Sequence, residues 1–511
     1  MIHLTDLTKG LEYRVMCGPA DTEISAIIYD SRKTVAGSLF VCVCGFMADG
    51  HRYISQALDK GAAAVMIQSG QTVLTLPELT AMALPKGAVV ISVPDTRRGL
   101  AHVSTVFFSH PSEKINLLGI TGTKGKTTTS YMIRDIFEKA GKSTGLIGTV
   151  ANIVAGEVRQ ADRTTPESYD LQALLAEMVQ KKLESCVMEV SSQGLMLDRT
   201  YGCRFQAGAF TNLYHDHISE HEHANMKEYL EAKMLIFDQS AVGVINNDSD
   251  ESGQVIEYAK SRCPVFTYGI DNSCDVRAVQ ISKDKQNGKI GTTFVLQSPW
   301  YNKSVFIAMP GKFNIYNALC AIAFAGICKI PFSAVREGLA AVAVPGRLQL
   351  VNHKGDFTVL VDYAHNAASM ENLLETLREY CPGRLITLFG CGGDRAKSRR
   401  FEMGEVSGRL SDVTVITSDN PRSEEPMDII SDILTGFSKT EGTYMVEPDR
   451  KRAISLAISL AKKDDFVIIA GKGHENYQIF RDHTIHFDDA ETASGLLFDI
   501  DLARGQEERN R

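Results

Sequence analysis

Residues 119–130 read GITGTKGKTTTS, and this stretch decides the fold of the domain around it. The apolar run INLLGIT enters it from residue 115, and TTTSYMIRDIFEKAGK leaves it from residue 127 with apolar residues at helical spacing. A strand, a glycine-rich loop and a helix in this order are typical of a phosphate-binding loop, in which backbone N–H groups and the helix N-terminus face the phosphates. Lys126 adds a point charge and Thr127 a hydroxyl for Mg²⁺, so the sequence predicts a nucleoside triphosphate site.

The loop differs in one position from the usual pattern G-x-x-x-x-G-K-[ST], because Ile120 stands where that pattern has glycine. A glycine-rich turn without a ligand is the simpler alternative. The strand before the loop and the helix after it favour the phosphate site. The loop alone does not say what the phosphate is for, since kinases, GTPases, motors and ligases share it.

The composition is that of an ordinary globular protein with several domains. The 511 residues exceed what one hydrophobic core organises, and 54 Lys+Arg stand against 62 Asp+Glu, for a net charge of −8. This charge argues against nucleic acid as a partner. The N-terminus MIHLTDLTKGLEYR has no apolar segment, and no run of about 18 apolar residues occurs. We therefore expect a cytoplasmic protein that is not attached to a membrane.

Cysteine and histidine spacing indicates no standard metal site. The eleven cysteines occur singly or as Cys42-Val-Cys44, which favours reduced thiols in a cytosolic protein over zinc ligands or disulfides. Four histidines gather within residues 215–223, but their spacing matches no zinc signature. We expect one functional histidine in that segment, with the others in a solvated polar loop.

The pattern of strands and helices predicts an α/β fold in three parts. Residues 1–112 carry strand-like runs such as SLFVCVCG, joined by a helical pattern at residues 53–67. Over residues 113–344, short apolar strands alternate with helical stretches, which predicts a mostly parallel sheet with helices on both faces. After the junction VPGRLQLV at residues 344–351, the strand cores TVLVDYA, RLITLFG, VTVITSD and DFVIIAG indicate a third α/β domain at residues 345–511.

Glu189 is the first candidate partner for the loop. It ends the apolar strand SCVME, and the carboxyl ends of parallel strands form the edge of the sheet where such folds bind ligands. A carboxylate there can bind Mg²⁺ beside Thr127. The alternative is an edge carboxylate with no ligand.

Several motifs in sequence order resemble the Mur ligases, the ATP-dependent enzymes that build the peptide of bacterial peptidoglycan. The matching segments are GTKGKTTT, EVSSQGL, TNLYHDH, EYLEAKMLIF, GKFNIYNALCAIA, VPGRLQLV, VDYAHN and GCGGDRAKSRR. They extend over essentially the whole chain. The resemblance implies a UDP-sugar-binding domain at residues 1–112, a P-loop ATPase domain at residues 113–344 and a Rossmann-like domain for the incoming amino acid at residues 345–511.

The resemblance also implies that ATP activates a carboxylate. Transfer of the γ-phosphoryl group makes an acyl phosphate, which an amine attacks with phosphate as the leaving group. The residues that it places around the nucleotide are Gly122, Thr123, Lys124, Gly125, Lys126, Thr127, Thr128, Asn314, Asn317, Arg347, Asp362 and His365. Because the last three lie on or after the junction, closure of the third domain is expected to cover the ATP.

A metal-binding and catalytic set follows from the same resemblance. Thr127 and Glu189 are expected to bind one Mg²⁺, and His217 to take part in a second metal site. Lys233 matches a lysine that is carbamylated in this family, and carbamylation turns the cation into an anion that can ligate or position Mg²⁺. The catalytic residues are therefore expected to be Lys126, Glu189, His217 and Lys233. An ordinary surface lysine is the alternative for Lys233.

The N-terminal segment YDSRKTVAGSLFVCVCGFMADGHRYI resembles the UDP-binding domain of the family member that adds the third peptide residue. Ser31 matches a uridine contact in that domain. Thr164, Thr165, Ser191 and Arg199 match positions that hold the acceptor, UDP-MurNAc-L-Ala-D-Glu. The expected partners are therefore this UDP-MurNAc dipeptide and a diamino acid, with the chain acting as a monomer.

The motif Asp419-Asn420-Pro421-Arg422 predicts which diamino acid is added. Meso-diaminopimelate differs from lysine by a second carboxylate, and a guanidinium binds a carboxylate bidentately, so Arg422 is the expected specificity residue. L-Lysine is the alternative amino acid, and an Asn-Pro turn with a solvated arginine is the alternative for the motif. The other residues expected at the diamino acid are Arg395, Asp419, Asn420, Pro421, Gly471 and Glu475.

Two departures from the family pattern are Lys124, where asparagine is usual, and Gln193, where histidine is usual. Neither removes an expected phosphate or metal ligand. A P-loop phosphotransferase or regulatory ATPase is the alternative from another functional class, and it would need neither an amino-acid pocket nor a UDP-binding domain. A silent UDP-sugar-binding protein is disfavoured because the expected phosphate and metal ligands are present.

Overall fold

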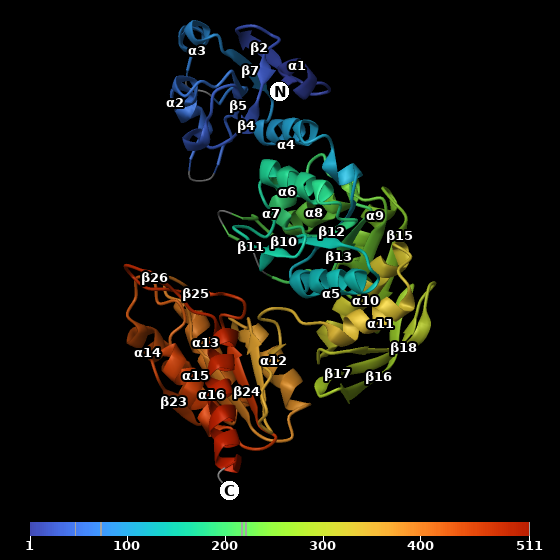
Figure 1. Ribbon diagram of the computed structural model, residues 1–511, viewed down its shortest axis with the longest axis vertical. Coiled ribbons are helices and arrows are strands. Elements are labelled where there is room, and N and C mark those ends of the chain that lie inside the picture. The colour runs from blue at the N-terminus through green and yellow to red at the C-terminus, as the bar shows by residue number, and fades with distance from the viewer. Residues whose placement is uncertain (46–47, 72–73, 216–217, 220–221, 510–511) are drawn as a thin grey trace. The chain divides into compact units, whose positions relative to one another are not determined.

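The computed structural model describes residues 1–45, 48–71, 74–215, 218–219 and 222–509. Figure 1 follows the chain from blue at the N-terminus to red at the C-terminus. The chain forms two compact units, one of residues 1–279, 296–303 and 316–338 and one of residues 280–295, 304–315 and 339–511. Each of the three expected segments contains one main sheet, and these sheets are mostly parallel, so the predicted α/β fold is confirmed. The boundaries expected at residues 112 and 344 stay a prediction.

The first sheet has the order β2-β7-β6-β5-β4, with parallel pairs except for β2 with β7. A short pair, β1 (Ile2–His3) with β3 (Glu23–Ile24), precedes it. The strands are β2 (Arg14–Cys17), β4 (Ala26–Ile28), β5 (Ser38–Val41), β6 (Ala64–Gln68) and β7 (Val89–Val93). The helices are α1 (Leu4–Leu7), α2 (Ile54–Asp59), α3 (Leu76–Ala83) and α4 (Thr96–Phe107).

The helical interpretation of residues 53–67 is only half right. Helix α2 ends at Asp59, and Gly61 then takes a φ of 87°, which turns the chain out of the helix. The apolar run that follows forms β6, which lies between β5 and β7 with Ala64 and Met66 fully buried. A continuous apolar run is compatible with a buried helix or a buried parallel strand, so periodicity alone could not separate the two.

The central sheet has the order β11-β10-β9-β12-β8-β13-β14-β15-β16-β17-β18. From β9 to β16 its neighbours are parallel, with β8 between β12 and β13. The strands are β8 (Asn116–Thr121), β9 (Thr144–Ile147), β10 (Ala151–Val154), β11 (Glu157–Gln160), β12 (Ser185–Glu189), β13 (Ala207–Phe210), β14 (Gly243–Asn246), β15 (Val265–Gly269), β16 (Val276–Gln286), β17 (Lys289–Gln297) and β18 (Asn302–Ile307). The helices are α5 (Lys126–Lys139), α6 (Ser168–Gln180), α7 (Ser192–Met196), α8 (Met226–Met234), α9 (Ser252–Lys260), α10 (Lys312–Ile327) and α11 (Phe332–Ala341).

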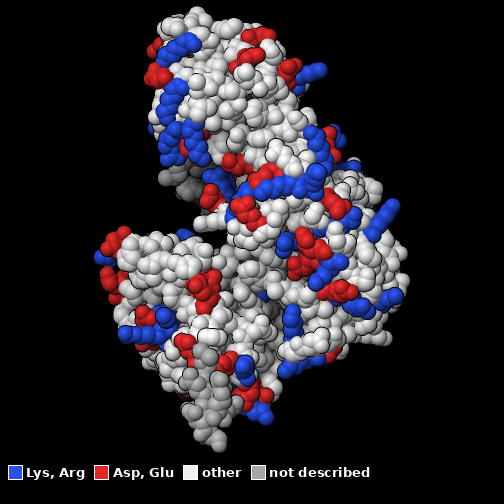
Figure 2. Space-filling view, in the orientation of Figure 1, with Lys and Arg blue, Asp and Glu red and all other residues white. Residues whose placement is uncertain are grey.

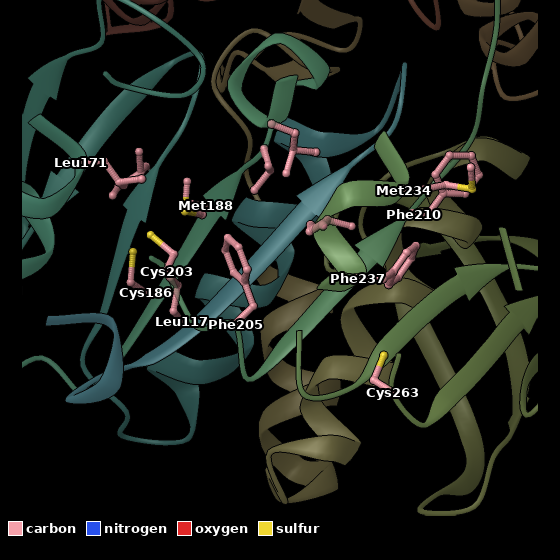
Figure 3. Close-up of a cluster of buried hydrophobic side chains, with 14 of the residues drawn as sticks. Leu117, Leu171, Cys186, Met188, Cys203, Phe205, Phe210, Met234, Phe237 and Cys263 are labelled. Atoms are coloured by element: carbon pink, nitrogen blue, oxygen red, sulfur yellow. The ribbon is translucent and has the colours of Figure 1, made fainter. Parts of the chain in front are cut away.

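A single apolar cluster anchors the strands that carry the nucleotide loop. Leu117 of β8 and Met188 of β12 are fully buried in it, and Phe205 packs beside them (Figure 3). Leu171 of α6 and Met234 of α8 add the helical layer. Because apolar burial stabilises a domain in proportion to area, this cluster holds the carboxyl ends of β8 and β12 at a common edge.

The C-terminal sheet has the order β19-β20-β24-β21-β22-β23, and its pairs are parallel except for β19 with β20. The strands are β19 (Gln349–Leu350), β20 (Thr358–Asp362), β21 (Leu385–Phe389), β22 (Val413–Ile416), β23 (Tyr444–Val446) and β24 (Phe466–Ala470), with the hairpin β25 (Tyr477–Ile479) and β26 (Thr484–His486). The helices are α12 (Ala367–Arg378), α13 (Lys397–Leu410), α14 (Pro426–Phe437), α15 (Arg450–Leu460) and α16 (Asp489–Arg509).

Charges of both signs are interspersed on the face of the molecule that Figure 2 shows. This mixture agrees with the moderate net charge of −8. Within the described ranges, no helix combines the length and the apolar character needed to cross a membrane.

A buried ion pair joins the first residues of α15 and α16 and links them to the ends of two strands of the C-terminal sheet. Arg450 Nε and Nη2 each donate to Asp489 at 2.7 Å, and both side chains are fully buried. The same guanidinium donates to Ser418 O at 3.1 Å and Ala470 O at 3.0 Å, just after β22 and at the end of β24. Arg450 therefore fixes the edge of the sheet at which ligands are expected.

We predict that Arg450→Met destabilises the C-terminal unit by about 3–5 kcal/mol, because it leaves the Asp489 carboxylate buried without its cation. The measurement is the urea midpoint of the full chain, followed by circular dichroism. Lys439→Met is the matched control, since it breaks the exposed 3.0 Å pair with Glu405 and should leave the midpoint unchanged. Equal midpoints for the two variants would contradict the prediction.

Candidate active site

The phosphate-binding loop joins β8 to α5 and depends on two glycines. The φ angle is 143° at Gly122 and 88° at Gly125, a range that residues with a Cβ rarely adopt. A Cβ would stand 1.9 Å from Thr211 Oγ1 at Gly122, and 2.4 Å from Asn317 Oδ1 at Gly125. Gly125 is also the N-cap of α5 and has no side chain to bond the first turn, which suits N–H groups that face a phosphate.

Glu189 lies against this loop at the end of β12. Its carboxylate is 1% exposed and accepts hydrogen bonds from Thr127 Oγ1, Thr149 Oγ1 and Thr149 N, all at 3.0 Å. A separation of 3.0 Å between the Thr127 and Glu189 oxygens matches the edge of an Mg²⁺ octahedron, roughly 3.0 Å for bonds of about 2.1 Å. A Cβ at Gly148 would stand 2.4 Å from Glu189 Oε1, so glycine leaves room beside the carboxylate. These residues fit Mg²⁺, whose binding stays a prediction.

The two lysines of the expected catalytic set have different surroundings. Lys126 Nζ donates to Gly122 O at 2.8 Å and to Thr123 O at 3.1 Å, so its ammonium lies over the loop. Lys233 is 1% exposed on α8, with Nζ 4.2 Å from the centroid of the Tyr229 ring. Tyr229 OH lies 3.2 Å from Thr123 Oγ1. The surface-lysine alternative for Lys233 is therefore wrong, and its carbamylation stays a prediction.

The histidine segment is only partly described. His217 lies outside the described residues, so its expected metal role is not tested. His223 is fully buried, with Nε2 2.8 Å from Ser192 Oγ and its ring centroid 4.9 Å from that of Tyr229. The expectation that the other histidines of this segment lie in a solvated polar loop is therefore wrong for His223.

Of the remaining expected nucleotide residues of the central segment, Lys124, Thr128 and Asn317 lie on or next to the loop, while Asn314 belongs to the other compact unit. Asn317 Oδ1 accepts from Thr129 Oγ1 at 3.3 Å and abuts Gly125. Thr128 is buried in the first turn of α5. Lys124 has an exposed side chain, while its N–H donates to Asn212 Oδ1 at 2.8 Å. Asn314 is buried and donates to Pro310 O at 2.8 Å.

Four residues expected at the UDP-linked acceptor come together beside Glu189. Thr165 Oγ1 donates to Glu189 O at 3.0 Å and accepts from Ser191 N at 2.9 Å. Arg199 Nη1 donates to Thr165 O at 3.2 Å. Thr164 Oγ1 lies 3.0 Å from Thr149 Oγ1, which binds the Glu189 carboxylate. An acceptor carboxylate held here would lie close to the expected metal site.

Ser31, the expected uridine contact, lies in the N-terminal domain just after β4. It is 6% exposed, and its Oγ donates to Gln56 Oε1 at 2.8 Å. Lys60 Nζ donates to its carbonyl at 3.0 Å. These bonds fix the backbone of the Ser31 turn.

Three expected nucleotide residues of the C-terminal unit surround Tyr363. The Arg347 guanidinium lies over the Tyr363 ring at 4.4 Å, and the His365 ring centroid lies 4.5 Å from it. Asp362 accepts from Leu348 N at 2.8 Å and Ala364 N at 2.9 Å. Burial raises the pKa of the Asp362 carboxyl, while Arg347 opposes that rise.

His474 belongs to the same group, although sequence reasoning did not select it. Its ring centroid lies 4.9 Å from that of Tyr363. Burial, followed by Arg347 and His365, lowers the pKa of His474 to about 4, so the imidazole is neutral at pH 7. Its position in the sequence GKGHE at residues 471–475, next to the expected Glu475, was the signal that could have found it.

A pocket with a cavity volume of about 170 Å³ opens at the carboxyl ends of β21, β22 and β24. Six of the seven residues expected at the diamino acid line it, and Pro421 is the exception. The lining consists of Tyr363, His365, Gly390, Cys391, Gly392, Arg395, Ala396, Arg399, Arg400, Asp419, Asn420, Arg422, Gly471 and Glu475.

Arg422 is held in a strained and well-defined position. Its φ is 53°, in the left-handed region that side chains with a Cβ disfavour. Its N–H donates to Ile479 O at 3.0 Å, and Nη1 donates to Gly393 O at 2.5 Å. A Cβ at Gly392 would stand 3.1 Å from Nη1, so glycine gives the guanidinium its place.

Glu475 supplies negative charge in the same pocket. Its Oε2 accepts from Asn420 Nδ2 at 2.8 Å and from the buried Lys472 Nζ at 3.4 Å. The pocket therefore contains arginines for carboxylates and a carboxylate for an ammonium group. This is the chemistry of a zwitterionic amino acid, and the roles of the single residues stay predictions.

In the described part of the chain, Cys44, Asp49 and His51 lie close enough to hold a metal ion. His51 Nε2 accepts from Gln68 N at 2.9 Å, so the proton of the neutral ring is on Nδ1, which donates to Asp49 Oδ1 at 2.6 Å. The nitrogen facing Cys44 thus has no lone pair for a metal. Burial, followed by Asp49, raises the pKa of the Cys44 thiol. The group is best explained as a structural hydrogen-bond cluster.

Comparison with known proteins identifies the family. A model of the Mur ligase middle domain matches residues 120–325, one of the Mur ligase glutamate ligase domain matches residues 346–473, and one of the Mur ligase family catalytic domain matches residues 23–107. The UDP-N-acetylmuramoyl-L-alanyl-D-glutamate–2,6-diaminopimelate ligase of Clostridium perfringens is 41% identical over 502 residues, with 97% of this chain and 99% of that protein covered. The protein of the same name from Bacillus licheniformis is 41% identical over 509 residues, with 97% and 99% covered.

A solved structure of a UDP-N-acetylmuramoyl-L-alanyl-D-glutamate–2,6-diaminopimelate ligase is 26% identical, covers 93% of this chain and 95% of its own, and superposes with a TM-score of 0.69. A MurF ligase from Thermotoga maritima, solved in complex with ADP, is 16% identical and shares the fold with a TM-score of 0.57. The similarity extends through all three segments. With this coverage and identity, the chain belongs to the Mur ligase family.

Proposed function

We propose that this chain is the ATP-dependent ligase that adds meso-diaminopimelate to UDP-MurNAc-L-Ala-D-Glu in peptidoglycan precursor synthesis. The pocket lined by Arg395, Arg422 and Glu475 carries the proposal, because its charges match a diamino acid with an extra carboxylate. Relatives named for this reaction are about 40% identical over nearly the full length.

The reaction must make a carboxylate electrophilic before an amine can attack it. The γ-phosphoryl group of ATP passes to the terminal carboxylate of the acceptor, which gives an acyl phosphate and ADP. The diaminopimelate amine then attacks the acyl carbon, phosphate leaves, and the amine loses a proton. The loop from Gly122 to Thr128 holds the phosphates, while Thr165, Ser191 and Arg199 orient the acceptor next to Glu189.

Thr127 and Glu189 would hold Mg²⁺, which neutralises charge on the transferring phosphoryl group. His217 and carbamylated Lys233 are proposed to complete the metal set. The position of Lys233 supports this. Its Nζ lies over the ring of Tyr229, whose hydroxyl contacts Thr123 of the loop, so the positive charge of an uncarbamylated Lys233 would repel the metal. Carbamylation reverses the sign of that charge.

Meso-diaminopimelate is favoured over L-lysine by the arginines of the pocket. Lysine would leave the Arg422 guanidinium without the distal carboxylate. We propose that the protein acts in the cytoplasm, which supplies ATP and the UDP-linked dipeptide, and that it acts as a monomer.

The first test is phosphate release with ATP, Mg²⁺ and UDP-MurNAc-L-Ala-D-Glu, comparing meso-diaminopimelate with L-lysine. We expect release only when dipeptide and amino acid are both present, and a strong preference for diaminopimelate. Arg422→Ala should remove most of that preference, by about 10–100-fold, since a charge-assisted bidentate pair is lost. Arg409→Ala, which breaks an exposed pair with Glu371, is the control.

Release from ATP without the dipeptide would instead support a P-loop phosphotransferase. An unchanged preference in Arg422→Ala would mean that another group reads the distal carboxylate. Equal rates with L-lysine in the wild type would overturn the choice of amino acid while leaving the ligase chemistry intact.

The second test concerns Lys233. We expect Lys233→Ala to lower kcat by about 10–100-fold, as for groups that support a metal site. Lys227→Ala on the same helix is the control, because its side chain is 80% exposed. Native mass spectrometry in bicarbonate should show one added carbon dioxide on the wild type and on Lys227→Ala, but none on Lys233→Ala. The same added mass on all three proteins would place the modification elsewhere.

A further inference from the structure

Arg97, at the start of α4, joins two segments that are far apart in sequence. Its Nη2 donates to Cys44 O at 3.1 Å, in the loop that follows β5. Its Nη1 donates to Glu167 Oε2 at 3.4 Å, just before α6. The side chain is only 16% exposed. Helix α4 packs against α6 (Figure 1), so Arg97 lies where the N-terminal sheet domain meets the central domain.

Glu167 is shared by three arginines. Besides Arg97, Arg163 Nη1 lies 3.3 Å and Arg199 Nε 3.5 Å from the same carboxylate oxygen. Glu167 is 7% exposed. Burial lowers the pKa of Arg199, Glu167 opposes this, and Arg163 and Arg97 make smaller contributions that lower it. Removing Arg97 would therefore leave Glu167 with two cations, and no carboxylate would become unpaired.

A chain of polar contacts leads from Arg97 to the reacting end of the site. Arg97 donates a hydrogen bond to Glu167, whose carboxylate forms a 3.5 Å ion pair with Arg199 Nε, and Arg199 Nη1 donates to Thr165 O. Thr165 in turn bonds the backbone of Glu189 and Ser191. In the other direction, Arg97 bonds the loop at Cys44, which follows β5. Strand β5 pairs with β4, and Ser31 lies just after β4.

The next residue of α4 makes a different contact. The Arg98 guanidinium lies over the Tyr201 ring at 4.3 Å, and Tyr29 OH separately donates to Asp170. These contacts also join the two domains, but they bond neither Cys44 nor Glu167. Arg98 is therefore a matched control for Arg97 in charge, size and helix.

We propose that Arg97 is a positioning residue for the UDP-linked acceptor, which it serves by keeping the N-terminal loop at Cys44 in register with the peptide-binding residues around Arg199. A ligand held at both ends binds tightly only when its two half-sites have the spacing of the ligand. The inference rests on the proposed function, in which uridine binds the N-terminal domain and the dipeptide binds beside Glu189.

The test is calorimetric binding of UDP and of UDP-MurNAc-L-Ala-D-Glu to the wild type, Arg97→Met and Arg98→Met. We expect Arg97→Met to weaken the dipeptide conjugate about tenfold, the loss of a charge-assisted hydrogen bond, and to leave UDP unchanged. The KM for the conjugate should rise by the same factor, with kcat and the KM for ATP preserved. Arg98→Met should bind both ligands as the wild type does.

An equal loss for UDP and conjugate would overturn the proposal, because Arg97 would then act within the uridine site alone. An unchanged conjugate affinity would overturn it as well. If Arg97→Met does not fold, Arg97→Lys replaces it, since a lysine reaches one acceptor and not both, and a smaller loss confined to the conjugate is expected. A wild type that binds no conjugate would refute the proposed function itself, which the wild-type titration shows before any variant is compared.

Discussion

The hydrogen bond between Thr127 and Glu189 ties the nucleotide loop to the neighbouring strand, and much of the site depends on it. Thr127 lies in the first turn of α5 and Glu189 ends β12, so the bond fixes loop, helix and sheet edge together. The buried carboxylate is satisfied by hydroxyl and amide donors and by no lysine or arginine side chain among those bonds. Its negative charge is therefore available to the Mg²⁺ that we propose arrives with the nucleotide.

The C-terminal unit also gathers charged side chains at a ligand-binding edge, but there the charges are mostly positive. Its pocket also lies at the carboxyl edge of a parallel sheet, but arginines dominate it. The buried pair of Arg450 and Asp489 braces that edge from behind and contributes no group to the pocket lining. Because Arg450 and Asp489 stabilise the edge of the sheet, Arg395 and Arg422 are not needed for that and can bind the proposed substrate.

Much of this arrangement could be predicted from the sequence because its signals are local. The loop glycines, Thr127 and the strand ending at Glu189 are each visible within a few residues, and so is the Asp-Asn-Pro-Arg motif. Residues 53–67 were partly misassigned because a buried strand and a buried helix have the same apolar composition. The burial of His223 and the contact of Arg97 with Glu167 were missed because they depend on packing between distant segments, which no local pattern encodes. His474 could have been selected from the sequence, because it adjoins the expected Glu475.

The left-handed backbone of Arg422 costs stability at the position to which we assign the choice of amino acid. Glycine adopts that conformation without strain, so replacing the arginine by glycine would relieve the backbone while removing the guanidinium. Drift toward a less selective pocket would then be favoured by folding itself. If Arg422 has the proposed role, selection on the choice of amino acid is what keeps arginine at this strained position, and loss of that selection would favour a pocket that accepts more amino acids.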